Sequence, residues 1–326
     1  MKMPSYPKYS ENEPLHRAVD LDEFDKVKQL LDEGMPPDAR TIHHVTPFMV
    51  AARRGRKAIA ELLIERGADV NARDRRSAVQ DGRCTPLHYA CETGQLKMVE
   101  LLLDHGADPD SATQNWRTPL SDAIFLHHKF RARCLLERGA SPNGPEKCGM
   151  PPIVAAAWND DLEMLAELLR RGADPNRKAH ENEFALYVTR SIECARELLA
   201  KGADVNMRNM EGYTVLIGNL RNITLELLDC YIKAGLDVNA KDKAEMPALM
   251  HLSRCPRLEI AKALVGAGAD INAPTKKGFT ILDDYQAMCR PDSEEQPDRE
   301  AIMNYLHSKG AMTGKALKMT GRRLKK

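Results

Sequence analysis

A short tag of the form Gly-Ala-Asp-x-Asn recurs along the chain at a nearly constant interval. Five of the eight intervals between its glycines are 33 residues, and the others are 39, 30 and 42. A fixed period of this length predicts a stack of similar units, each of which buries its apolar face only against its neighbours. The glycines are Gly34, Gly67, Gly106, Gly139, Gly172, Gly202, Gly235, Gly268 and Gly310.

A second signature stands about twenty residues before each tag, and Thr85-Pro86-Leu87-His88-Tyr89-Ala90 is its clearest copy. Thr85 suits a helix N-cap and Pro86 suits the first helical position, where no backbone donor is lost. Apolar residues then follow at helical spacing from Leu96 to Leu103, and the tag glycine suits a left-handed C-cap. Each unit is therefore predicted to be helix, loop, helix and turn, and we expect His88 to bond polar groups of its own or the adjoining unit.

These two signatures resemble the ankyrin repeat, which has a 33-residue period and a Thr-Pro-Leu-His-x-Ala motif. The resemblance implies an all-α solenoid of about nine helix–loop–helix units over residues 13–314, with a concave face. An N-terminal extension over residues 1–12 and a basic, solvated C-terminal tail over residues 315–326 flank the array. The units are expected to end near residues 39, 72, 111, 144, 177, 207, 240, 273 and 314.

Three segments depart from the regular period. The longer intervals predict an extended turn over residues 73–83 and an exposed acidic loop over residues 289–298. The 30-residue unit lacks about one helical turn near Tyr187, which predicts a shortened first helix. Because nearest-neighbour contacts hold such an array together, we expect this junction to be its weakest point.

Composition excludes several classes of protein. The 48 Lys and Arg residues nearly balance 47 Asp and Glu, for a net charge of +1, which argues against a protein that binds nucleic acid through bulk charge. The longest apolar run, residues 153–158, is far shorter than the roughly 18 residues of a membrane-spanning helix. The N-terminus lacks the apolar region of a secretory signal. We therefore expect a cytoplasmic protein whose eight well-separated cysteines are reduced.

No pattern in the sequence predicts catalysis. Phosphate-binding glycine loops, nucleophile elbows and HExxH motifs are absent from the sequence. Cys84, His88 and Cys91 have the residue types of a zinc site, but the repeat position of His88 already explains that residue. We expect no catalytic, cofactor-binding or metal-binding residue, and we expect that the protein is not an enzyme.

The resemblance implies that partners contact the turn tips and the exposed end of each first helix. Trp and Arg are enriched in interface hot spots, so Trp158 is the leading candidate, and Trp116 occupies a usual glycine position at a tip. The alternatives are burial of Trp158 against the next unit and an ordinary solvated surface at Arg53, Arg54, Arg56 and Lys57. The candidate contact residues are Arg53, Arg54, Glu92, Trp116, Arg117, Phe125, Met150, Trp158, Asn159, Tyr213, Arg221 and Arg254.

The leading functional hypothesis is a non-catalytic module that binds one folded protein on its concave face. Such a module acts as an adaptor or as an inhibitor. The resemblance also implies two more specific roles, a toxin-neutralising immunity protein and a host-directed bacterial effector. An alternative is nucleic-acid or anionic-surface association through residues 73–83 and the basic tail, which predicts binding that weakens steeply with salt. We expect a protein partner and a monomer in the free state, with nucleic-acid binding disfavoured and no membrane partner.

Overall fold

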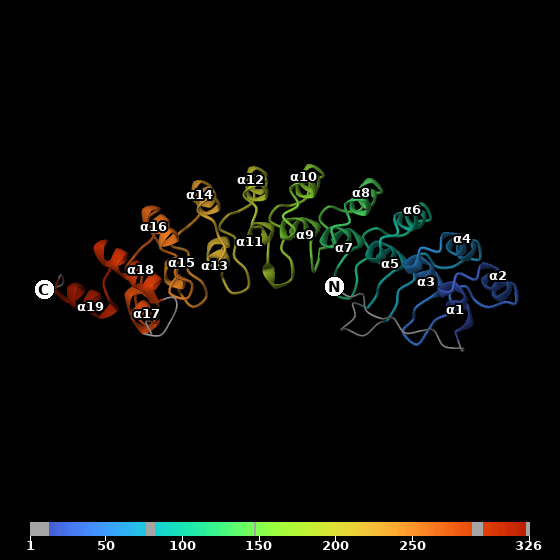
Figure 1. Ribbon diagram of the computed structural model, residues 1–326, viewed down its shortest axis with the longest axis horizontal. Helices are drawn as coiled ribbons and strands as arrows, with labels where there is room; N and C mark the ends of the chain where they lie inside the picture. Colours follow the sequence, from blue (N-terminus) through green and yellow to red (C-terminus); the bar gives the residue numbers. More distant parts are fainter. Residues whose placement is uncertain (1–12, 76–81, 147, 289–295, 324–326) are drawn as a thin grey trace. The chain divides into compact units, whose positions relative to one another are not determined.

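The computed structural model describes residues 13–75, 82–146, 148–288 and 296–323. Helices and turns make up these described residues, and no named strand occurs among them (Figure 1). Helices α1 to α18 follow one another as nine consecutive pairs, and one further helix, α19, follows them. The prediction of an all-α array of nine helix–loop–helix units is confirmed, whereas the extension expected over residues 1–12 lies outside the described residues.

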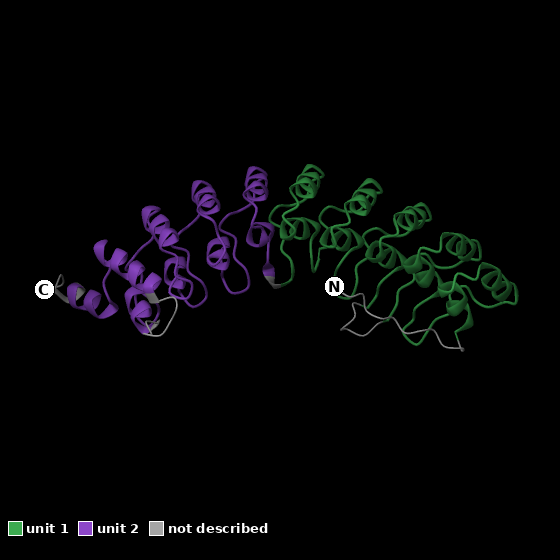
Figure 2. Ribbon diagram, viewed as in Figure 1, with its two compact units in different colours: residues 1–180 green, residues 181–326 purple. Residues whose placement is uncertain are grey.

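The chain divides into two compact units, residues 1–180 and 181–326, and the division falls at the shortened repeat (Figure 2). In unit 1 the first helices of the repeats form one layer and the second helices form another. The first helices are α1 (Pro14–Asp20), α3 (Pro47–Arg54), α5 (Pro86–Thr93), α7 (Pro119–Phe125) and α9 (Pro152–Trp158). The second helices are α2 (Phe24–Asp32), α4 (Lys57–Glu65), α6 (Leu96–Asp104), α8 (Lys129–Glu137) and α10 (Leu162–Arg170).

Unit 2 repeats this two-layer arrangement, and within it each first helix packs on the first helix of the following repeat. Its first helices are α11 (Ala185–Val188), α13 (Val215–Asn219), α15 (Ala248–His251) and α17 (Ile281–Met288). Its second helices are α12 (Ile192–Ala200), α14 (Leu225–Lys233), α16 (Leu258–Gly266) and α18 (Gln296–Ser308). Helix α19 (Gly314–Arg323) ends the described chain.

The first helices begin where the sequence predicts. The hydroxyl of Thr46 accepts the backbone N–H of Met49 at 3.3 Å, and Thr118 caps α7 through Ser121 N at 3.2 Å. At α5, His88 Nδ1 accepts the backbone N–H of Thr85 at 3.2 Å, while His88 Nε2 lies 3.4 Å from the carbonyl oxygen of Arg117 in the next repeat. His88 therefore joins two repeats, as its motif position predicts.

Small side chains allow the first helices to pack closely on one another. Ala51, Ala52 and the run Ala155–Ala157 have no exposed surface. Each second helix then ends at a tag glycine, and all nine of these glycines have φ between 81° and 93°. This left-handed conformation carries little cost for glycine and strains other residues, so the predicted C-caps are confirmed.

The tag asparagines connect the turns of successive repeats. Asn71 donates from Nδ2 to the carbonyl oxygen of Gly106 at 3.0 Å and accepts the backbone N–H of Asp108 at 2.8 Å. The same pair of bonds recurs at Asn143 in unit 1 and at Asn206 and Asn239 in unit 2. One side chain thus satisfies a donor and an acceptor of the neighbouring turn, which explains why the tag keeps an amide at this position.

The C-terminal repeats differ from the sequence-based expectation in two places. Residues 289–295 of the predicted acidic loop lie outside the described residues, but α18 already begins at Gln296, within the range assigned to that loop. The basic tail expected from residue 315 is helical as far as Arg323. The backbone at Gly314, where this helix begins, packs closely on the turn at Gly278, because an added Cβ there would lie 2.0 Å from the carbonyl oxygen of Gly278. The shortened first helix predicted near Tyr187 is present as the four-residue α11.

Candidate protein-interaction surface

One position recurs at the end of the first helix in most repeats, four residues before the second helix begins. We call it the helix-end position. Its occupants in unit 1 are Asp20, Arg53, Glu92, Phe125 and Trp158, and in unit 2 they include Arg221 and Arg254. Six of these seven residues were predicted as contacts. The set contains charged residues and aromatic residues, and the structure places them in different environments.

The basic pair at the end of α3 is already engaged. Arg53 is only 6% exposed, so the prediction that it is an accessible contact residue is wrong. Arg54 is exposed, but its Nε lies 2.7 Å from a carboxylate oxygen of Asp20 in the preceding repeat. Arg56 pairs with Asp22 at 2.9 Å in the same way. The sequence indicated the charges but not that the first repeat supplies their partners.

Two aromatic side chains occupy the helix-end position in consecutive repeats of unit 1. Phe125 ends α7 and is 40% exposed, while Trp158 ends α9 and is 51% exposed. The exposure of Trp158 contradicts the alternative of burial. Helices α7 and α9 pack against each other, so about 8–10 Å separates their axes. We call Phe125 and Trp158, which occupy equivalent positions of adjacent repeats, the aromatic pair.

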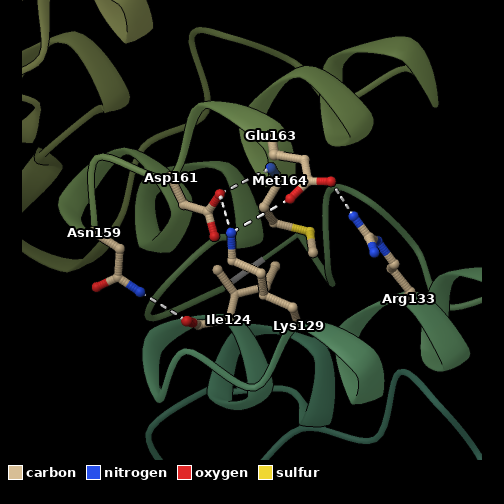
Figure 3. Close-up of polar contacts among 7 residues, drawn as sticks. All are labelled: Ile124, Lys129, Arg133, Asn159, Asp161, Glu163 and Met164. Carbon is tan, nitrogen blue, oxygen red and sulfur yellow. Dashed lines mark hydrogen bonds and ion pairs between the residues drawn. The ribbon is translucent and has the colours of Figure 1, made fainter.

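Polar contacts between the two repeats hold the loops that follow this aromatic pair (Figure 3). Asn159 donates from Nδ2 to the carbonyl oxygen of Ile124 at 2.7 Å, which is a positioning role rather than a free contact. The ammonium of Lys129 lies 3.2 Å from Asp161 and 3.4 Å from Glu163, and Arg133 also pairs with Glu163. These cross-repeat bonds fix the backbone on which the aromatic pair stands.

The turn tips place the remaining candidates in different environments. Trp116 is 47% exposed and has φ of 60°, which confirms that it stands at a glycine-like turn position. Its carbonyl oxygen accepts the backbone N–H of Gly149 at 2.9 Å, so neighbouring tips are joined. Arg117 pairs with Asp122 at 2.6 Å, and Met150 is half-buried.

Two further candidates are also partly covered. Glu92, on α5, is half-buried. Tyr213 is half-buried as well, and its ring packs edge-on against His251 with centroids 5.7 Å apart.

Sequence reasoning missed several exposed apolar side chains. Ile42 is 87% exposed at a tip, Phe130 is 75% exposed on α8, and Phe279 is 53% exposed at a tip in unit 2. A helical wheel of α8 was the available signal for Phe130, because the buried Ala132, Leu135 and Leu136 define the opposite stripe.

Burial shifts the pKa of several titratable groups of the interior. Burial lowers the pKa of His88 to about 4, which keeps its ring neutral and able to accept the Thr85 N–H. Burial also lowers the pKa of His251, although the Asp242 carboxylate 2.9 Å away opposes that change. Burial raises the pKa of the Cys91 thiol, which disfavours the reactive thiolate.

Within the described ranges, no three His, Cys, Asp or Glu side chains form a group that could hold a metal ion. The seven described cysteines are free thiols. Across the same ranges, no helix is both long and apolar enough to cross a membrane.

Comparison with known sequences assigns the repeats to a family. Family models match as "Ankyrin repeats (3 copies)" over residues 4–74 and 76–146, as "Ankyrin repeats (many copies)" over residues 48–103, and as "Ankyrin repeat" over residues 148–180. An ankyrin repeat-containing protein of Schizosaccharomyces pombe is 33% identical over 78 residues, which is 24% of this chain and 38% of that protein.

Larger proteins contain similar segments. The human transient receptor potential cation channel subfamily A member 1 is 25% identical over 52% of this chain and 12% of its own length. The rice (Oryza sativa subsp. japonica) potassium channel KOR2 is 41% identical over 19% of this chain and 8% of its own. The chain thus spans well under half of these curated relatives.

A solved structure shares the fold. The ankyrin repeat domain of human ASB11 superposes with a TM-score of 0.55 and 23% identity, and the match covers 67% of this chain and 97% of that domain. The repeat period, the cap and turn bonds, the family matches and this fold agree, so the chain belongs to the ankyrin repeat family.

Proposed function

We propose that the protein is a non-catalytic module that binds a folded partner protein through the Phe125 and Trp158 aromatic pair. Bound there, it acts as an adaptor or as an inhibitor that covers part of the partner's surface. Ankyrin repeats generally mediate protein–protein interaction, and stacked repeats offer a long continuous surface for it.

The observation that carries the proposal is the exposure of two aromatic rings at equivalent positions of neighbouring repeats. Trp and Tyr dominate interface hot spots, and exposed aromatic groups on rigid elements lose little conformational entropy when they bind. The Lys129 and Asn159 bonds provide this rigidity in unit 1. By contrast, the charge of Arg54 is already paired with Asp20 in a salt bridge.

The test starts with capture of partners from source-cell lysate on the wild-type chain and on a Phe125→Ala/Trp158→Ala double variant. A protein that the double variant fails to retain is then purified, and its affinity is measured by calorimetry. We expect the double variant to bind at least about tenfold more weakly, as hot-spot truncation usually produces. Phe279→Ala, which removes a similarly exposed aromatic ring from unit 2, is the matched control and should leave affinity unchanged.

Thermal unfolding separates loss of contact from loss of fold. Because Phe125 and Trp158 are both exposed, the double variant should unfold at the wild-type temperature. Equal affinity of the double variant and wild type would place the contact elsewhere. The absence of any saturable partner in the lysate would remove the proposed function itself.

A further inference from the structure

Unit 2 carries two exposed arginines at the helix-end position of consecutive repeats. Arg221 stands four residues before α14 and Arg254 stands four residues before α16. Neither guanidinium forms an ion pair among the described residues, in contrast to Arg54 in unit 1. Helices α13 and α15 pack against each other, so these two free cations lie on neighbouring repeats of one surface.

Other guanidinium groups occupy the backbone acceptors beside them. Arg257 donates to the carbonyl oxygens of Leu220 at 3.1 Å and Ile223 at 2.6 Å, which lie on either side of Arg221. Arg299, which is 8% exposed, donates from Nε to the carbonyl oxygen of Ser253, the residue before Arg254. Arg221 and Arg254 therefore compete with bound donors for these carbonyl oxygens, and both arginines remain exposed.

The neighbouring carboxylates form no ion pair with Arg221 or Arg254 among the described residues. Glu259, at the start of α16, pairs with Lys262 at 2.8 Å. Asp284 accepts a hydrogen bond from the Ser253 hydroxyl. Glu226, on the first turn of α14, forms no ion pair among the described residues. The exposed charges of Arg221 and Arg254, which form no ion pair among the described residues, favour an anionic ligand.

The spacing of the repeats indicates the backbone conformation of that ligand. Packed first helices lie about 8–10 Å apart. A polyproline II segment rises about 3.1 Å per residue with three residues per turn, so its residues i and i+3 are about 9 Å apart on the same side. In a β-strand, residues three apart point to opposite faces. A polyproline II segment therefore presents two carboxylates, three residues apart, at about the spacing of the two repeats.

We propose that unit 2 binds an acidic, extended segment of a partner protein, with two carboxylates three residues apart on Arg221 and Arg254. Arginine suits this ligand because its planar fork forms paired hydrogen bonds with a carboxylate. A protein ligand is favoured over nucleic acid because the whole chain carries a net charge of only +1. The inference rests on the proposed protein-binding function but uses a surface distinct from the aromatic pair.

The probe is a fluorescein-labelled nine-residue proline-rich peptide with Asp at positions 4 and 7, titrated with the full chain in an anisotropy assay. A peptide of the same composition with Asp at positions 4 and 6 tests the spacing, and an Asn version tests the charge. We expect the 4/7 peptide to bind at least about fivefold more tightly than the 4/6 peptide and the Asn peptide to lose binding.

Protein variants identify the residues. Arg221→Ala and Arg254→Ala should each weaken binding of the 4/7 peptide about tenfold, as loss of one charge-assisted bidentate pair predicts. Arg221→Lys keeps the charge but loses the fork, and it should fall between wild type and alanine. Arg196→Ala removes an exposed arginine from α12 and is the matched control, with no expected change.

Three outcomes would overturn the inference. They are equal binding of the 4/7 and 4/6 peptides, insensitivity to both arginine substitutions, and tighter Arg221-dependent binding of a single-stranded RNA ten-mer than of the peptide. The Phe125→Ala/Trp158→Ala variant should bind the peptide as wild type does. If a partner is captured but the peptide does not bind, this inference alone is rejected. If the peptide binds but no partner is captured, the aromatic-pair function is rejected.

Discussion

The phenolic hydroxyl of Tyr89 donates a hydrogen bond of 2.6 Å to a carboxylate oxygen of Asp74, and both side chains are buried. The other carboxylate oxygen of Asp74 accepts the backbone N–H of Cys84 at 2.8 Å. Asp74 thus connects the two sides of the extended turn to α5. Residues 76–81 of that turn lie outside the described residues.

Tyr89→Phe should lower the free energy of unfolding by about 1.5–3 kcal/mol, because a buried carboxylate loses a charge-assisted donor. Urea denaturation followed by circular dichroism measures the change. Tyr285→Phe is the matched control, since the Tyr285 hydroxyl is buried without a hydrogen-bond partner among the described residues. Its removal should be neutral or slightly stabilising. Equal losses from the two substitutions would show that the loss of the packed hydroxyl group, not of the bond to Asp74, sets the cost.

The tag asparagines allow a graded test of the bonds between turns. Asn143 donates to the Gly172 carbonyl oxygen at 3.1 Å and accepts the Asp174 N–H at 2.7 Å. Asn143→Asp keeps the acceptor but loses the donor, as Asp110 does naturally where it accepts the Ser141 N–H at 2.9 Å. Asn143→Ala loses both bonds.

We expect the aspartate variant to be destabilised by about 1 kcal/mol and the alanine variant by about twice as much, since a typical hydrogen bond contributes about 0.5–1.5 kcal/mol. Chemical denaturation of the three chains under one condition gives the order. If alanine and aspartate cost the same, the acceptor bond to the Asp174 N–H contributes nothing.

The sequence predicted the fold because its strongest signals act locally. Threonine caps, tag glycines and the His88 motif specify each repeat within about 33 residues, and similar repeats then stack on their neighbours. Relations between repeats were harder to predict. The burial of Arg53 depends on packing, and the pairing of Arg54 with Asp20 joins residues 34 positions apart, so neither follows from a local pattern.

The same difference between local and inter-repeat signals explains the outcome for Trp116 and for Trp158. Trp116 was assigned correctly because its repeat position alone requires a positive φ. Whether the Trp158 ring is exposed depends on packing that a helical pattern does not specify. The helix over residues 314–323 was missed because its basic composition, taken alone, resembles a solvated segment.

Acid should destabilise the protein partly through His88. Burial lowers its pKa from 6.5 to about 4 in the folded chain, so between these two values the unfolded chain binds the proton more readily. Stability is therefore fully present above pH 6.5 and falls as the pH drops toward 4. A fully titrating group of this kind contributes up to about 1.4 kcal/mol per pH unit.

His88→Gln removes this titration, although loss of the Thr85 and Arg117 bonds lowers stability at every pH. The informative quantity is the slope of the unfolding free energy between pH 4.5 and 6.5, measured by urea denaturation. The slope should be shallower in the variant by up to about 1.4 kcal/mol per pH unit. Parallel curves for the two chains would mean that His88 is protonated equally in the folded and unfolded states.

Trp116 has a left-handed backbone conformation that suits glycine. Substitutions by glycine and by alanine therefore separate the contribution of the Trp116 ring to binding from the effect of its backbone on stability. Its φ of 60° strains any residue with a Cβ. Trp116→Gly and Trp116→Ala remove nearly the same side chain and differ only in that Cβ. The glycine variant should therefore unfold at higher urea than the alanine variant, with a free-energy difference of about 1 kcal/mol. Both variants should bind a captured partner with the same affinity as each other, below wild type if the ring forms part of the contact. An alanine variant as stable as the glycine variant would show that the turn relaxes out of the left-handed region once the indole is gone.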